Sequence, residues 1–231
     1  MSGEVTSGVH RMGTSRVNWY LIAEHGRFTA VDSGLRGYGA RLEQDLASVG
    51  AKAEDVEAVV LTHSDGDHTG IAAALSRAGA RVMIHRADET TLRNPAPKGG
   101  EASPVHMLPH LWRPVLVGFA AHLLRNGWAR PIPPAEVELF ADGDELDVPG
   151  HLRVVHTPGH TPGHCALLLS GGIVFAGDAL CTWNPFDGSR GPQLMSAPAN
   201  VDNAQAHVSL ERLQALKPRL LLPGHGDPWS D

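Results

Sequence analysis

The chain has 231 residues, of which 25 are acidic and 19 are basic, so its formal net charge is −6 at pH 7. This length is most simply one domain, residues 1–231, and it is sufficient to bury a large core. The interspersed charges lack the basic patch that supports nucleic-acid binding, and no apolar run reaches the roughly 18 residues of a membrane span. The N-terminus also lacks the basic region and early apolar core of a signal peptide, so we expect a soluble, cytoplasmic protein whose two cysteines, Cys165 and Cys181, are reduced.

The N-terminal part of the chain alternates between strand-like and helical patterns. Apolar and β-branched runs predict strands over residues 17–22, 28–31, 56–61 and 81–85. Apolar residues at helical spacing predict helices over 38–49 and 69–78, which Gly50 and Gly79 would end. This order predicts helices packed on a sheet, and in such sheets ligands gather beyond the carboxyl ends of the strands.

A dense group of metal-capable side chains follows the strand expected over 56–61. It contains His63, Asp65, Asp67 and His68 within six residues, which a surface loop has no structural reason to concentrate. Three further candidates stand at later junctions between a strand and a loop: His160, Asp178 and His225. Seven ligands are enough for two metal ions, and two ions about 3.5–4 Å apart are a known means of activating water.

Residues 94–134 interrupt the alternation of strands and helices. Both ends of this segment are rich in proline, with glycine at the first end, and an apolar stretch of helical character lies between them. We interpret it as a helical insertion of one or two helices within the domain. It is either a packing appendage or, functionally, a wall or lid over the metal site or an oligomer contact.

The rest of the chain returns to short strands. These are expected over residues 137–140, 145–148, 152–156, 165–169, 173–176 and 219–222, with glycine-containing turns between them. Asp202 is predicted to be the N-cap of a helix that runs to about residue 216, where Pro218 would stop it.

With these motifs in this order, the sequence resembles the metallo-β-lactamase-fold hydrolases. That family carries H-x-H-x-D-H, a distant His, a bridging Asp and a final His, and here the pattern reads His63-x-Asp65-x-Asp67-His68, His160, Asp178 and His225. The resemblance implies an α/β fold, a four-layer αββα sandwich with the metals at one edge of two sheets. It implies that His63, Asp65 and His160 hold one ion, that Asp67, His68 and His225 hold a second, and that Asp178 bridges them. Asp32 matches a family position that supports the ligands.

One position departs from the family pattern, because Asp65 stands where the family has its second His. A carboxylate still binds zinc and suits harder ions well, so we expect two divalent ions, zinc first, with iron or manganese as alternatives. An additional negative charge would make the site less electrophilic and raise the pKa of a bridging water. Two other side chains near the motifs are weaker candidates: His164, expected in a structural hydrogen bond rather than on a metal, and Asp227, either a supporting carboxylate or an exposed one.

The resemblance implies hydrolysis by a hydroxide bridged between the two ions, with Asp67 as the catalytic residue that orients this nucleophile and moves its proton. The expected substrate is a small molecule with an ester, lactone, thioester or amide-like bond, and no nucleic-acid or membrane partner is expected. Alternatives within the same fold are a phosphodiesterase and an iron-dependent redox enzyme of the diiron or sulfur dioxygenase type. A metal-binding protein without turnover is a third class. The oligomeric state is left open between monomer and homodimer.

Overall fold

The computed structural model describes residues 3–95, 98–130 and 132–230. Its larger sheet has, in spatial order, β1 (Gly3–Thr6), β2 (Val9–Gly13), β3 (Asn18–Glu24), β4 (Arg27–Val31), β5 (Val56–Val60), β6 (Arg81–His85) and β7 (Glu138–Phe140). The first four strands pair antiparallel, whereas β4 to β7 pair parallel. The carboxyl ends of β5 and its neighbours therefore meet at one edge of the sheet.

The smaller sheet runs in the order β13 (Leu220–Pro223), β10 (Ile173–Gly177), β9 (Cys165–Leu169) and β8 (Arg153–His156). Its strand β13 pairs parallel with β10, although α6 (Asn203–Ala215) and two further strands separate them in sequence. Those strands, β11 (Cys181–Trp183) and β12 (Arg190–Gln193), form a separate antiparallel pair. This topology brings the chain after β10 beside the chain after β13.

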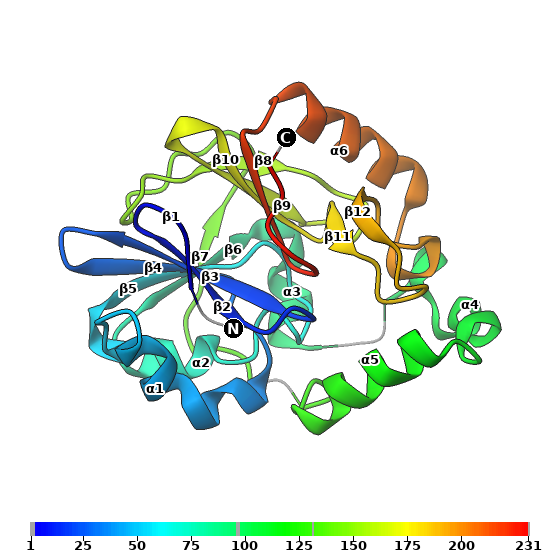
Figure 1. Cartoon of the computed structure of the whole chain (residues 1–231), viewed down its shortest axis with the longest axis horizontal. Coiled ribbons are helices and arrows are strands. Elements are labelled where there is room, and N and C mark those ends of the chain that lie inside the picture. The colour runs from blue at the N-terminus through cyan, green and yellow to red at the C-terminus, as the bar shows by residue number, and fades with distance from the viewer. Residues whose placement is uncertain (1–2, 96–97, 131, 231) are drawn as a thin grey trace.

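Helices cover both outer faces of the two sheets, which gives four layers. Figure 1 shows α6 on one side of the molecule and α1 (Leu42–Ala47) and α2 (Ala72–Arg77) on the opposite side, with the strands between them. The remaining helices are α3 (Glu89–Arg93), α4 (Pro104–Met107) and α5 (Pro114–Arg125). The architecture is the αββα sandwich that the sequence predicts. Among the described residues, no helix is long and apolar enough to cross a membrane.

Alternation along β3 shows how the sequence specifies these layers. Trp19 and Leu21 point into the core that also contains Leu46 and Leu75 from the helical layer. The residues between and after them, Tyr20 and Ile22, belong instead to the core between the two sheets. Because successive side chains on a strand face opposite sides, a strand buried on both faces has a continuous apolar run.

Several expected elements differ from those in the structure. Residues 145–148 contribute only a single bridge, between Glu145 and Arg153, because the chain turns back at Pro149 and at Gly150, where φ is +95°. The helix expected over 38–49 begins with a 3-10 turn, η1 (Arg36–Arg41), before α1. Strands β1, β2, β11 and β12 were not predicted from the sequence. The N-cap at Asp202 is confirmed, since its Oδ1 accepts from the Gln205 amide at 2.9 Å.

The segment 94–134 lies in sequence between two strands that pair directly, β6 and β7, and it contains α4 and α5. Figure 1 shows these two helices together at the margin of the molecule, away from α1 and α2. Many apolar side chains of the segment are exposed, including Trp112 and Leu124, whereas Leu116 and Phe119 of α5 are buried. The inner face of α5 therefore packs against the body of the domain.

Candidate metal centre

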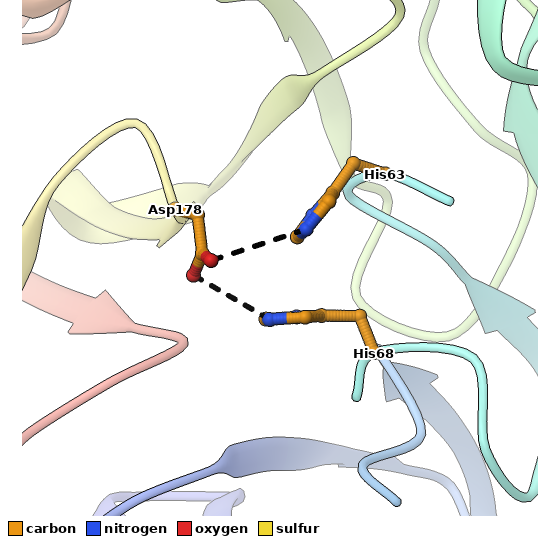
Figure 2. Close-up of side chains that lie close together, drawn as sticks. All are labelled: His63, His68 and Asp178. Atoms are coloured by element: carbon orange, nitrogen blue, oxygen red, sulfur yellow. Dashed lines mark ion pairs between the residues drawn. The ribbon is translucent and has the colours of Figure 1, made fainter. Parts of the chain in front are cut away.

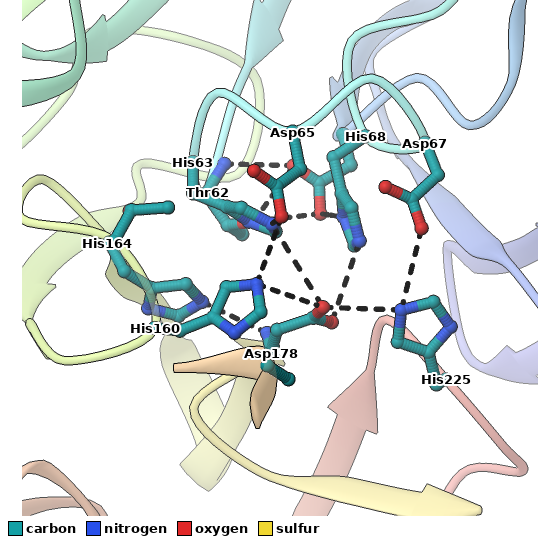
Figure 3. A network of polar contacts seen from close by, with 12 residues as sticks. Thr62, His63, Asp65, Asp67, His68, His160, His164, Asp178 and His225 are labelled. Atoms are coloured by element: carbon teal, nitrogen blue, oxygen red, sulfur yellow. Dashed lines mark hydrogen bonds and ion pairs between the residues drawn. The ribbon is translucent and has the colours of Figure 1, made fainter. Parts of the chain in front are cut away.

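The seven predicted ligands come from four loops that meet at one edge of the sandwich. His63 to His68 follow β5, His160 follows β8, Asp178 directly follows β10, and His225 follows β13. Figure 3 shows their side chains pointing toward one another across the edge. All of them are buried except Asp65, whose side chain is 21% exposed.

The side chains form two groups, each able to hold one ion. In the first, His63 Nε2 and His160 Nε2 lie 3.5 and 3.1 Å from Asp65 Oδ2. In the second, the donor atoms of Asp67, His68 and His225 all lie within 4.8 Å of one another. We call these groups the first and the second ion position.

Asp178 lies between the two positions. Its Oδ2 is 4.0 Å from His63 Nε2 and 3.4 Å from His160 Nε2 on one side, and 3.1 Å from His225 Nε2 on the other. Its Oδ1 is 3.5 Å from His68 Nε2. Figure 2 shows the carboxylate facing both His63 and His68. One carboxylate thus contacts all four imidazoles, as a bridging ligand would.

The four imidazoles present the same nitrogen, Nε2, to this space because each Nδ1 has another partner. The partners are Thr62 Oγ1 at 2.9 Å for His63, Asp32 Oδ2 at 2.9 Å for His68, Asn200 Oδ1 at 3.3 Å for His160, and the Arg16 carbonyl oxygen at 2.5 Å for His225. A hydrogen bond at one ring nitrogen fixes the orientation and tautomer of a metal ligand at the other.

Polar atoms without partners show that the cluster suits a cation. Among the described residues, His63 Nε2, His68 Nε2 and Asp178 Oδ1 are buried without a hydrogen bond. Burying such atoms unpaired costs free energy, and buried polar groups in native proteins are rarely left so. Imidazole nitrogen and carboxylate oxygen are also the donors that zinc, iron and manganese accept. The residues therefore fit divalent metal ions.

Asp32 supports the second position by holding one of its imidazoles. It holds His68 Nδ1 and also accepts from the Thr62 amide and hydroxyl at 2.8 and 2.9 Å. Its own backbone adopts φ of +58°, an uncommon conformation for a residue other than glycine. One carboxylate thus fixes His68 directly, and through the hydroxyl of Thr62 it also fixes His63.

Asp88 supports the first position indirectly, because it joins two of its loops, and it was not singled out in the sequence. It is fully buried and accepts from the Ser64 amide at 3.1 Å, the Thr161 hydroxyl at 2.7 Å and the Gly163 amide at 2.6 Å. These contacts join the loop of His63 to the loop of His160. The only local signal is an acidic residue soon after a buried strand, β6.

His164 and Asp227 have structural roles in this arrangement. His164 Nδ1 lies 2.9 Å from the Thr157 hydroxyl, and its Nε2 accepts from the Asp178 amide at 2.9 Å, so it positions Asp178. The side chain of Asp227 is 60% exposed and pairs with Arg11 at 2.8 Å. Of the two predicted roles, a supporting carboxylate or an exposed one, Asp227 therefore has the second. Cys165 and Cys181 are free and buried, and burial raises the pKa of both thiols.

The electrostatics of the two positions differ. At the second position, burial alone would lower the pKa of His68 and His225, but the nearby carboxylates, Asp178 with Asp32 for His68 and Asp178 with Asp67 for His225, together raise both. At the first position, burial and then the Lys98 ammonium lower the pKa of His160. Burial would raise the pKa of Asp65, yet Lys98 and the imidazoles hold it well below its usual value.

Three described residues of the segment 94–134 contact the candidate site. The ring of Phe119 in α5 meets the ring of His225 edge-on, with centroids 5.3 Å apart. Trp128 lies against the ligand loop, since a Cβ added to Gly66 would come within 2.9 Å of its carbonyl oxygen. Lys98, at the start of the segment, reaches Asp65 and His160. Of the predicted alternatives for 94–134, the role of a wall over the site stays a prediction.

Comparison with known proteins agrees with this arrangement. The sequence is 29% identical over 209 residues to the probable metallo-hydrolase YqjP of Bacillus subtilis, an alignment that covers 87% of this chain but only 64% of that protein. It is 38% identical over 87 residues to hydroxyacylglutathione hydrolase of Aeromonas hydrophila, or 37% of this chain and 30% of that enzyme. The structure resembles a metallo-beta-lactamase family protein of Thermus thermophilus, with a TM-score of 0.71, 28% identity, and coverage of 99% and 76% of the two chains.

The family comparison covers the whole site. The sequence model of the metallo-beta-lactamase superfamily matches residues 12–225, which include all seven predicted ligands. With the metallo-hydrolase relatives, this match indicates an enzyme of the hydrolase type. The chain belongs to the metallo-beta-lactamase superfamily.

Proposed function

We propose that this chain is a metal-dependent hydrolase that cleaves an ester, lactone, thioester or amide-like bond in a small molecule. The observation that carries the proposal is the position of Asp178, whose carboxylate lies within 4.0 Å of one nitrogen of each of four imidazoles. No structural role requires one buried carboxylate to serve four histidines. A bridge between two cations explains the arrangement.

The ligand set we propose is His63, Asp65 and His160 for one ion, Asp67, His68 and His225 for the other, and Asp178 for both. Two divalent ions held by these residues would supply a hydroxide nucleophile at neutral pH and would polarise the bond to be cleaved. Zinc is the first expectation, and three carboxylates among seven ligands make iron or manganese reasonable alternatives.

Asp67 is the residue we propose to orient the nucleophile and move its proton. Its Oδ2 lies 3.6 Å from His225 Nε2, and its side chain is only 9% exposed, so the carboxylate faces the cluster rather than solvent. A positioned carboxylate of this kind contributes roughly 10²–10⁴-fold to a rate through proton transfer. Phe119 and Trp128 would exclude water from one side, which suits a partly apolar substrate.

The carboxylate of Asp65 favours a second candidate function, that of an iron-dependent redox enzyme of the same fold. Oxygen donors favour harder ions than an all-imidazole set does, and iron in this setting supports oxygen chemistry. The metal decides between the two: purified, metal-replete protein that contains iron, is coloured and has no hydrolase activity would favour the redox enzyme.

A panel of chromogenic lactone, thioester, β-lactam and phosphodiester substrates tests the proposed hydrolase. We expect turnover of one of the first three classes by the metal-loaded protein, loss after chelation, and recovery when metal is returned. Asp67→Asn should lower kcat by roughly 10²-fold or more. Asp227→Asn is the matched control, an exposed carboxylate in a neighbouring loop whose loss should leave kcat unchanged. Activity that survives chelation, or equal rates for both variants, would contradict the proposal.

A further inference from the structure

Lys98 belongs to a loop that is fixed against the part of the chain that holds His160. The Glu101 amide donates to the Val201 carbonyl oxygen at 3.1 Å, and Gly100, with φ of +61°, lies so close to that oxygen that a Cβ would collide with it. Asn200, next to Val201, accepts from His160 Nδ1. The position of Lys98 relative to His160 is therefore set by packing between two loops.

The ammonium of Lys98 lies among the ligands of the first ion position. Its Nζ is 2.6 Å from Asp65 Oδ2, 2.8 Å from His160 Nε2 and 3.4 Å from the Ala199 carbonyl oxygen. An ammonium has three N–H donors, and these are three acceptors. The side chain is only 21% exposed, and charge-assisted hydrogen bonds of this kind are stronger than neutral ones.

Lys98 and a metal ion require the same lone pair. An ammonium cannot accept a hydrogen bond, so His160 Nε2 must accept from it, and Nδ1 carries the proton that faces Asn200. A metal ion would bind that same Nε2 lone pair. The two cations therefore exclude one another at His160, and an ion can enter the first position only after Nζ has left.

The second ion position has different neighbours. Among the described residues, the contacts of Asp67, His68 and His225 include no ammonium or guanidinium group. An ion that binds there competes only with protons on its own ligands and displaces no lysine or arginine side chain, and His68 Nε2 and Asp178 Oδ1 have no hydrogen-bond partner. The ligand sets look alike in the sequence, but the surroundings of the two positions differ.

We propose that Lys98 is a built-in occupant of the first ion position, so that the second position fills first and the first fills only by displacing Nζ. The inference rests on the proposed metal centre. It makes the chain a one-ion protein when metal is limiting and a two-ion protein when metal is abundant. The ammonium also balances the charge that Asp65 adds relative to a histidine.

Titration of Zn²⁺ into the metal-stripped full chain, followed by calorimetry and by metal analysis after dialysis, tests this proposal. The wild-type protein should bind one equivalent tightly and the second more weakly. In Lys98→Met, the second equivalent should tighten by about 10- to 100-fold, because no charge-assisted hydrogen bond has to be broken, while the first is unchanged. Lys98→Gln provides a neutral polar variant should Met perturb the loop. Lys52→Met, at an exposed lysine remote from the site, is the matched control.

The outcomes separate this proposal from the metal centre itself. Two equivalents that bind equally tightly in wild type, with no change in Lys98→Met and Lys98→Gln, would overturn the role of Lys98 and leave the two-ion centre intact. Weaker binding of the second equivalent in both variants would make Lys98 a supporting residue and would also overturn the proposal. Failure of wild type and variants to bind any zinc, iron or manganese would overturn the metal centre and this proposal with it.

Discussion

The two ion positions have similar ligands but different surroundings. The second, with Asp67, His68 and His225, is enclosed by the sandwich and backed by the Asp32 carboxylate. The first, with His63, Asp65 and His160, is partly exposed at Asp65 and is contacted by Lys98 from the insertion. Similar donor sets therefore do not imply similar affinities, because what must be displaced to bind an ion also counts.

The largest effect should follow the loss of the residue that both positions share. Asp178→Ala removes the contact to all four imidazoles and should cost both ions, more than the ~10–100-fold loss of affinity typical of a partner that only orients a ligand. Metal analysis after dialysis against a weak chelator measures this. Asp187→Ala, at an exposed carboxylate, is the control. Full metal content in Asp178→Ala would show that this residue is not a bridge.

Asp32→Asn should act on the second position more than on the first. The Asn side chain keeps the size of the carboxylate but weakens its hydrogen bond to His68 Nδ1, so the first zinc equivalent should bind ~10–100-fold more weakly. The corresponding change for the first position is Asn200→Ala, which frees His160 Nδ1 and should affect only the second equivalent. Calorimetric titration of both variants measures the difference, and identical effects on both equivalents would remove the distinction between the positions.

The pH dependence of metal binding should also differ between the positions. An imidazole must be neutral to bind an ion. The pKa values of His68 and His225 are raised, because Asp178, together with Asp32 for His68 and Asp67 for His225, outweighs the effect of burial, so an ion must displace a proton from each. Affinity at the second position should therefore fall with acidification, by about tenfold per pH unit for each displaced proton. His160, whose pKa is lowered by burial and Lys98, is already neutral at pH 7.

Titrations at pH 6, 7 and 8, repeated in buffers with different enthalpies of ionisation, count the protons released with each equivalent. Binding of the first equivalent should release protons from His68 and His225. Binding of the second equivalent should release fewer, because His160 is already neutral. Affinity for the first equivalent that does not change with pH would mean that the second position is not filled by displacing protons from His68 and His225.

The smallest effect concerns stability rather than metal content. Asp88→Asn leaves at least one of three buried donors without an acceptor, so the free energy of unfolding should fall by about 1–3 kcal/mol. Urea denaturation of the metal-free protein measures this. Asp142→Asn breaks an exposed ion pair with Arg212 and should cost less than ~1 kcal/mol. Equal costs would mean that Asp88 does not join the two ligand loops.

The sequence predicts the sandwich well because a buried strand has a clear signature. The run Val56–Val60 is apolar at most positions, and in the structure it is β5, an interior strand of the larger sheet directly before the ligand loop. Strand β12 could not be predicted, because Arg190–Gln193 contains both glycine and proline and does not alternate apolar with polar residues. Residues 145–148 have the pattern of a strand, but the turn at Pro149 and Gly150 follows too soon for a ladder to form.

Only part of the candidate site can be predicted from the sequence. The seven predicted ligands stand next to glycines and strand ends, so each has a local signal, and the structure brings all seven together; their binding of metal remains a prediction. Lys98 and Asn200 have no such signal, and Asp88 has only its place soon after β6. Each acts through a contact between loops that are far apart in sequence, such as Lys98 with His160, and side-chain pattern within a single loop cannot reveal it.

Anomalous diffraction from crystals of the full chain, grown with limiting and then with excess zinc, tests the central claim most directly. At limiting zinc we predict one anomalous peak among Asp67, His68 and His225, with Lys98 Nζ still against His160. At excess zinc we predict a second peak among His63, Asp65 and His160, on the opposite side of the Asp178 carboxylate, with Nζ displaced. No peak at either position under excess zinc, iron or manganese would contradict the account.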